Sequence, residues 1–204
     1  MEKQFLIAGF GGQGVLLIGQ LIAKAAMRQG YEVSWMPSYG PEMRGGEANC
    51  AVVVSDEPIG SPLVSEPPVL VAMNKPSLMK FMPMMPAGGT LLYNASLIEG
   101  VELRTDVTVI PVACNEVAEQ LGNGRVSNMV MLGAIQAATG VVTDDNLVQT
   151  LRLAGREKSP PARHQPQSHR SGPRQGVTPW TPFRRKDVEG IGAPRGQAFM
   201  VALG

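Results

Sequence analysis

The stretch Phe5-Leu6-Ile7-Ala8-Gly9-Phe10-Gly11-Gly12-Gln13-Gly14 decides the fold of this chain. A short apolar run leads directly into a glycine-rich segment, and apolar residues with helical spacing follow from residue 15. This order predicts a buried strand, a tight turn and the start of a helix. The backbone N–H groups of such a turn can approach a phosphate closely. The turn therefore indicates a fold class and one functional edge, and it leaves the ligand open.

Short apolar runs alternate with helical patterns up to residue 155. We expect strands at residues 4–9, 31–36, 48–55, 68–73, 90–94 and 107–112. We expect helices at residues 15–27, 76–81, 115–121, 126–139 and 143–153. This alternation predicts a single Rossmann-like α/β domain over residues 1–155, with a mostly parallel sheet and helices on both faces.

Composition excludes several classes of protein. The 204 residues are 44% hydrophobic, which suits one globular domain. No apolar run reaches the length of about 18–20 residues that spans a bilayer, and the first residues do not resemble a signal peptide. Cys50 and Cys114 are too few for a disulfide scaffold or a cluster site, so we expect two core thiols, no metal site and a cytoplasmic protein.

Residues 156–204 differ in composition from the rest and form a basic tail rich in Pro and Arg. They carry nine Lys and Arg against three Asp and Glu, whereas residues 1–155 carry nine against 14. The tail holds both histidines, His164 and His169, and no strand or helix pattern. Three interpretations stay open: a disordered tail, a gene end read out of frame, and a nucleic-acid-binding arm.

The glycines Gly9, Gly11 and Gly14 have the spacing of a dinucleotide-binding turn. In that class an acidic residue at the end of the second strand binds the ribose. Here the second strand ends Ser34-Trp35-Met36-Pro37, and Glu32 lies near its start. A nicotinamide or flavin dinucleotide is therefore disfavoured. A phosphate-containing ligand, a docked partner loop and a turn kept only for packing remain as alternatives.

Residues 37–46 form a polar loop after the second strand, which places it at the same sheet edge as the glycine turn. The loop offers a phenol at Tyr39, a carboxylate at Glu42 and a guanidinium at Arg44, framed by glycines. Ligands of open α/β sheets bind at this edge. The alternatives are a binding or docking loop and a solvated turn with an internal Glu42–Arg44 pair.

Three asparagines point to the same edge. Asn74 and Asn94 follow the fourth and fifth strands, where each either caps a turn or faces the site. Asn128, in the first turn of an apolar helix, either bonds the strand ends or caps its own helix. We find no catalytic set: no Ser-His-Asp order, no Gly-Lys-Ser/Thr phosphate loop and no paired carboxylates. This favours a subunit over a complete enzyme.

Taken together, these motifs are similar to the gamma subunit of 2-oxoacid:ferredoxin oxidoreductases, most of all the 2-oxoglutarate and ketoisovalerate members. The matching segments are residues 9–16, 37–46, 48–50, 55–62, 72–78, 122–123, 125–126 and 128–129. The resemblance extends over roughly residues 4–153. From Arg156 onward the chain departs from the family pattern, which continues with Leu periodicity.

The resemblance implies an assembled enzyme that decarboxylates a 2-oxoacid oxidatively to an acyl-CoA. Thiamine diphosphate and iron–sulfur clusters would reside on other subunits, and electrons would pass to ferredoxin. The expected partners are alpha and beta subunits, with a delta ferredoxin-like subunit as a further candidate. This chain alone would hold no cofactor, touch no membrane or nucleic acid, and help to form the coenzyme A access region. The residues that we assign to that region are Gly9, Gly11, Gly12, Gln13, Gly14, Ser38, Tyr39, Gly40, Glu42, Arg44 and Asn74.

Two other functions remain open. A stand-alone nucleotide-binding module or dehydrogenase would bind NAD, FAD or ADP in isolation. A nucleic-acid-associated protein would bind through its basic tail with a steep dependence on salt. The substrate 2-oxoacid and the subunit stoichiometry are not encoded in any motif that we recognise.

Overall fold

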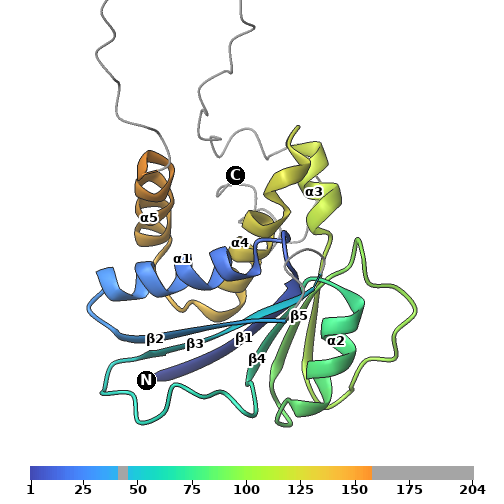
Figure 1. Ribbon diagram of the computed structural model, residues 1–204, viewed down its shortest axis with the longest axis horizontal. Helices are drawn as coiled ribbons and strands as arrows, with labels where there is room; N and C mark the ends of the chain where they lie inside the picture. The colour runs from blue at the N-terminus through green and yellow to red at the C-terminus, as the bar shows by residue number, and fades with distance from the viewer. Residues whose placement is uncertain (41–45, 158–204) are drawn as a thin grey trace, which may run out of the picture.

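The computed structural model describes residues 1–40 and 46–157. Six strands form one sheet in the order β2-β3-β1-β4-β5-β6 (Figure 1). The strands are β1 (Glu2–Phe10), β2 (Glu32–Tyr39), β3 (Glu47–Ser55), β4 (Val69–Ala72), β5 (Thr90–Asn94) and β6 (Thr108–Val112). The helices are α1 (Val15–Arg28), α2 (Lys75–Phe81), α3 (Cys114–Gln120), α4 (Ser127–Thr139) and α5 (Asp144–Glu157), with short 3-10 helices η1 (Met82–Met84) and η2 (Gly124–Val126).

Five strands run in one direction and β3 opposes them. β3 is antiparallel to both β1 and β2, whereas β1, β4, β5 and β6 pair in parallel. This confirms the mostly parallel sheet. It also shows that β1 and β2, which α1 connects, are not neighbours, because β3 lies between them. The parallel strands and β2 still end at the same edge, which we call the carboxyl edge.

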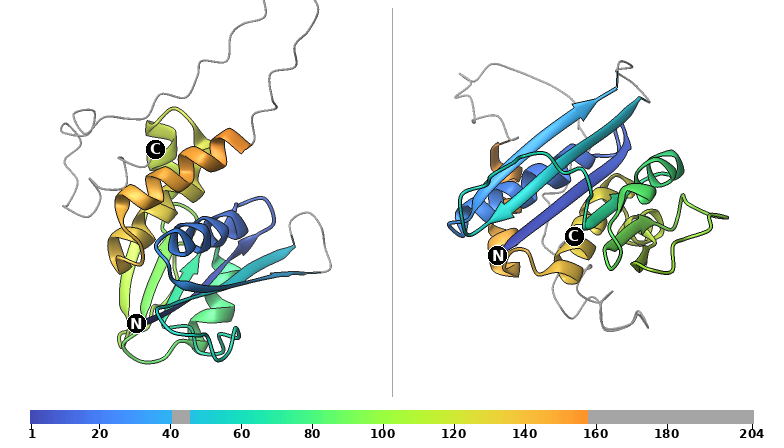
Figure 2. Two further views of the ribbon diagram at one scale, coloured as in Figure 1. Left: turned by 90° about the vertical axis from the view of Figure 1, so that its left-hand side faces the viewer. Right: turned by 90° about the horizontal axis from the view of Figure 1, so that it is seen from below.

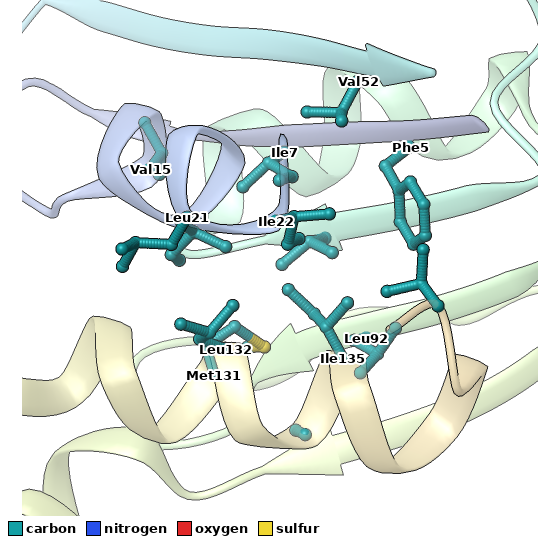
Figure 3. Packing of buried hydrophobic residues seen from close by; sticks show 14 of the residues in the cluster. Phe5, Ile7, Val15, Leu21, Ile22, Val52, Leu92, Met131, Leu132 and Ile135 are labelled. Atoms are coloured by element: carbon teal, nitrogen blue, oxygen red, sulfur yellow. The ribbon is translucent and has the colours of Figure 1, made fainter. Parts of the chain in front are cut away.

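Helices cover both faces of the sheet, as expected. Alternation along β1 sends Phe5 and Ile7 to the face covered by α1, α3, α4 and α5, and Leu6 and Ala8 to the face covered by α2. Figure 2 shows the sheet and its helices in two further views, turned to one side and seen from below. In the larger core, side chains of α1 and α4 meet over the sheet, as Figure 3 shows for Ile22 and Ile135. This packing of two apolar helix faces fixes where both helices begin, at the carboxyl edge.

The predicted elements match the observed ones within a few residues, apart from two differences. β2 continues through Pro37, Ser38 and Tyr39, where the sequence predicts a loop, because the antiparallel pairing with β3 extends to Tyr39 and Ala48. α5 continues to Glu157, beyond the predicted end at residue 153. The rest of the tail, with both histidines, lies outside the described residues.

Cys50 and Cys114 are core thiols, as the sequence predicts. Both are fully buried, and burial raises the pKa of each thiol to about 12. Within the described ranges, no helix is long and apolar enough to cross a bilayer.

Both edge strands of the sheet contain a proline within their span. Pro37 lies in β2 and Pro111 in β6. Proline has no N–H to donate and is confined in sheets to edge strands, strand starts and bulges. The sequence therefore marks these two strands as the outer ones.

Candidate functional site

The glycine turn joins the end of β1 to the start of α1 at the carboxyl edge. Gly12 and Gly14 have φ angles of +99° and +75°, which side chains other than glycine rarely adopt. The N–H of Gln13 donates to the carbonyl of Phe10 at 3.1 Å and closes the turn. Gly14 is the N-cap of α1 and provides no side-chain cap, so the first N–H groups of the helix are left for other partners.

The side chain of Gln13 holds the turn in place. Its Oε1 accepts hydrogen bonds from the N–H of Phe10 at 2.7 Å and from Nδ2 of Asn74 at 3.0 Å. Its Nε2 donates to the carbonyl of Met73 at 3.2 Å. Asn74 in turn caps α2, with Oδ1 accepting from the N–H of Ser77 at 2.9 Å. The cap function predicted as one alternative for Asn74 is therefore confirmed, and the residue also links α2 to the glycine turn.

Two glycines permit close approaches that a side chain would prevent. A Cβ at Gly9 would lie 2.7 Å from Oε1 of Gln13 and 2.9 Å from Cβ of Met73. A Cβ at Gly14 would overlap the side-chain amide of Asn128, at the start of α4. α4 has no side-chain cap, so Asn128 does not cap its own helix. Its amide lies against the glycine turn, and no hydrogen bond from it to a strand end is found among the described residues.

The end of the β2–β3 hairpin lies beside the glycine turn. The N–H of Gly11 donates to the carbonyl of Gly46 at 2.9 Å, and the N–H of Gly40 donates to the carbonyl of Glu47 at 2.7 Å. Tyr39, with 71% of its surface exposed, ends β2 at this edge. The structure thus brings Ser38, Tyr39 and Gly40 to the edge that holds Gly9–Gly14. Glu42 and Arg44 lie outside the described residues.

A polar cavity of about 460 Å³ opens at the same edge, between the glycine turn and the segment from α3 to α4. Its lining residues are Gly12, Gln13, Asn94, Leu97, Asn115, Gly124, Arg125, Ser127 and Asn128. Sequence reasoning pointed to the glycine turn and to Asn94 and Asn128, and it missed Asn115 and Arg125. A usable signal existed, because an asparagine ends or closely follows each of the strands β4, β5 and β6.

Asn94 and Asn115 connect the ends of β5 and β6 across this cavity. The N–H of Ser96 donates to Oδ1 of Asn94 at 3.2 Å, and Nδ2 of Asn94 donates to Oδ1 of Asn115 at 3.0 Å. The N–H of Asn115 donates to the hydroxyl of Ser96 at 3.1 Å. Asn94 is fully buried, so these bonds satisfy an amide that would otherwise be costly to bury. The turn-capping interpretation of Asn94 is confirmed.

A larger cavity of about 760 Å³ lies elsewhere, between α2 and the connection formed by residues 100–106. The Arg104–Asp106 ion pair lines it at 2.5 Å. The ammonium of Lys75, also at this cavity, donates to the carbonyl of Glu99 at 3.1 Å. Of the residues that line this larger cavity, only Lys75 lies next to a residue of the candidate site at the carboxyl edge.

Comparison with known proteins identifies the chain's relatives. Residues 4–162 match the family model described as pyruvate ferredoxin/flavodoxin oxidoreductase. The chain is 45% identical over 136 residues to the ketoisovalerate oxidoreductase subunit VorA of Methanothermobacter marburgensis, covering 67% of this chain and 28% of that subunit. It is 42% identical over 150 residues to the 2-oxoglutarate synthase subunit KorC of the same organism, covering 70% of this chain and 81% of that subunit.

A solved structure shares this fold. It is the 2-oxoglutarate:ferredoxin oxidoreductase from Magnetococcus marinus with 2-oxoglutarate, coenzyme A and succinyl-CoA bound. The TM-score is 0.72 at 25% identity, over 78% of this chain and 28% of that one. The matched part thus spans less than a third of the length of both VorA and this structure, but most of KorC. Because the family model covers more than half of its residues, the chain belongs to the pyruvate ferredoxin/flavodoxin oxidoreductase family.

Proposed function

We propose that this chain is the gamma-type accessory subunit of a 2-oxoacid:ferredoxin oxidoreductase. The observation that carries the proposal is its 42% identity to KorC over 81% of that subunit's length. The match therefore covers most of one subunit, and it does not cover a complete enzyme. The substrate class is a 2-oxoacid, with 2-oxoglutarate and ketoisovalerate as the candidates that the names of the relatives supply.

The family resemblance implies that the cofactors lie on other subunits. Oxidative decarboxylation needs a group that stabilises a carbanion and a path for electrons, and we assign thiamine diphosphate and iron–sulfur clusters to the partner subunits. Those partners are alpha and beta subunits, with a delta ferredoxin-like subunit as a further candidate. The described residues of this chain contribute a rigid turn and a polar edge. We assign coenzyme A to this edge, and the bound coenzyme A in the Magnetococcus marinus structure supports that assignment. A cytoplasmic location accords with this role.

The interpretation as a stand-alone dinucleotide enzyme has less support. In dinucleotide-binding sheets the second strand lies beside the first, and its terminal acid reaches the ribose. Here β3 separates β2 from β1, and β2 ends with Ser38 and Tyr39. The ribose-binding position next to the glycine turn is therefore occupied by a strand running the other way.

Reconstitution tests the proposal. The alpha and beta subunits should reduce ferredoxin with a 2-oxoacid and coenzyme A only when this chain is added, and the chain alone should show no turnover. Titration with 2-oxoglutarate and with ketoisovalerate identifies the substrate. Turnover that is unchanged when the chain is omitted, or decarboxylation by the isolated chain, would refute the role.

A pair of variants tests the assignment of the edge. Tyr39→Ala removes an exposed side chain at the carboxyl edge and should raise the KM for coenzyme A in the reconstituted complex. Leu63→Ala is the matched control, because Leu63 is similarly exposed, at 66% against 71%, and follows β3 at the opposite edge. Equal KM values for the two variants would place the coenzyme elsewhere.

A further inference from the structure

Two amide side chains that line the polar cavity beside the glycine turn, those of Gln13 and Asn115, direct hydrogen-bond donors toward it. This follows from how its amide side chains are oriented. An amide can turn either its oxygen or its nitrogen toward a cavity, and the backbone groups that bind it decide which. Backbone partners fix the orientation of the Gln13 amide and of the linked amides of Asn94 and Asn115, which line this cavity.

The first of these amides is that of Gln13. The N–H of Phe10 can bond only to an acceptor, so it fixes Oε1 of Gln13, and the carbonyl of Met73 fixes Nε2. Oε1 accepts a second bond from Asn74, which uses both lone pairs of the oxygen. What Gln13 retains for another partner is an N–H on Nε2.

The other two amides, those of Asn94 and Asn115, are hydrogen-bonded to each other. The N–H of Ser96 fixes the oxygen of Asn94, so Nδ2 of Asn94 donates to Asn115 and fixes the oxygen of that residue in turn. The Nδ2 group of Asn115 is then free to donate, and it has no partner among the described residues. The cavity thus receives donors from Asn115 on one side and Gln13 on the other.

The charges around the cavity are positive, which suits the same kind of ligand as the amide donors do. Arg125 is the one ionised side chain among the residues that line the cavity, and within the described part of the chain its guanidinium forms no ion pair. The starts of α1 and α4 also lie here without side-chain caps, and they add the partial positive charge of two helix N-termini. A guanidinium, unpaired amide N–H groups and two helix ends all favour an anion with several acceptor oxygens.

We propose that this cavity is a phosphate-binding subsite, with Arg125 and Nδ2 of Asn115 as its principal ligands. The inference rests on the proposed function for the identity of the molecule that carries the phosphate. Coenzyme A and thiamine diphosphate both present phosphate groups of the same chemistry. The cavity volume of about 460 Å³ accommodates a diphosphate with part of its attached group.

Isothermal titration of the full chain, without partner subunits, tests the proposal. The probes are coenzyme A, 3′-dephospho-coenzyme A, thiamine diphosphate, thiamine and inorganic pyrophosphate. We expect saturable binding of pyrophosphate and of one of the two coenzymes, a result that would replace the expectation that the chain alone holds no cofactor. If removing the 3′-phosphate lowers the affinity for coenzyme A, the subsite binds that phosphate of coenzyme A. If thiamine diphosphate binds more tightly than thiamine, the subsite binds the diphosphate of that coenzyme.

Two substitutions make the test specific. Asn115→Asp is isosteric, keeps the acceptor for Asn94 and replaces the free donor by a negative oxygen, so phosphate binding should be lost. Arg125→Gln removes an exposed charge and should weaken binding about tenfold or more. Arg152→Gln is the matched control on the exposed side of α5 and should change affinity by less than about twofold.

Three results would overturn the subsite. They are the absence of saturable binding for every phosphate probe, unchanged affinity in Arg125→Gln, and equal losses in Arg125→Gln and Arg152→Gln. Because Arg125 is exposed, Arg125→Gln should fold, and its affinity for the phosphate probes tests the subsite even if Asn115→Asp does not fold. A reconstituted complex with normal turnover and an unchanged KM for both coenzymes in Arg125→Gln would refute the subsite and leave the proposed subunit role intact.

Discussion

Replacement of Gly14 by alanine tests the link between the glycine turn and α4. Gly14 has φ and ψ of 75° and 18°, in the left-handed region, and its missing side chain leaves the space that the Asn128 amide occupies. Gly140, the C-cap of α4, has φ and ψ of 54° and 34°, and a Cβ there would meet nothing within 4 Å. The two positions therefore share backbone strain and differ in steric overlap.

The expected loss of unfolding free energy follows from the backbone strain and the steric overlap. An alanine in the left-handed region costs about 1–2 kcal/mol, which is the whole expected loss for Gly140→Ala. At Gly14 the overlap with Asn128 forces a side-chain or backbone shift that costs a further 1–3 kcal/mol, roughly. Gly14→Ala should therefore lower the free energy of unfolding by about 2–5 kcal/mol. Since 1 kcal/mol shifts the Tm of a domain of this size by about 2–4 °C, thermal unfolding resolves the two variants.

The assay is urea unfolding of Gly14→Ala, Gly140→Ala, Asn128→Ala and the double variant Gly14→Ala/Asn128→Ala. Removing the Asn128 side chain should relieve the overlap, so the double variant should lose less stability than the sum of the single losses. If Gly14→Ala is as mild as Gly140→Ala, or if the losses simply add, the turn and α4 are not in steric contact and the reasoning fails.

Three further outcomes follow from the structure. Burial raises the pKa of Cys50 and Cys114 from 9.0 to about 12, so between these values the unfolded chain loses thiol protons that the folded chain keeps. The free energy of unfolding should therefore fall as pH rises from about 9 toward 12, which urea unfolding at each pH measures. The hydrogen bond from Arg104 holds the pKa of Asp106 below its ordinary value, so Arg104→Gln should raise that pKa in an NMR titration. Asn74→Ala removes the cap of α2 and a bond to the turn, and should cost about 1–3 kcal/mol in urea unfolding.

Local sequence predicts most of the fold because each element carries its own signal. The strand β5 was predicted with its observed ends, since Gly88-Gly89 precedes it and its apolar run is short. The position of β3 between β1 and β2 carries no such signal. Its apolar pattern suits either direction, and only the antiparallel pairing of β3 with both β1 and β2 reveals the direction.

The candidate site was predicted in part for the same reason. The glycine turn and the end of β2 are contiguous motifs, and the expectation that they share an edge is confirmed. The contact of Asn128 with Gly14 and the bond between Asn94 and Asn115 join residues far apart in the chain. The packing of α4 against α1 brings Asn128 to Gly14, and the pairing of β5 with β6 brings Asn94 to Asn115, and neither depends on residues adjacent in sequence.

The prolines in the two outer strands bear on how this protein behaves at high concentration. A bare sheet rim is a template on which another chain can add a strand, and repeated addition leads to fibrils. Pro37 and Pro111 each remove one donor from a rim and hold the backbone at a fixed φ, so an added strand would meet a gap in its ladder of hydrogen bonds. The two prolines therefore disfavour the addition of a strand from another chain at either rim.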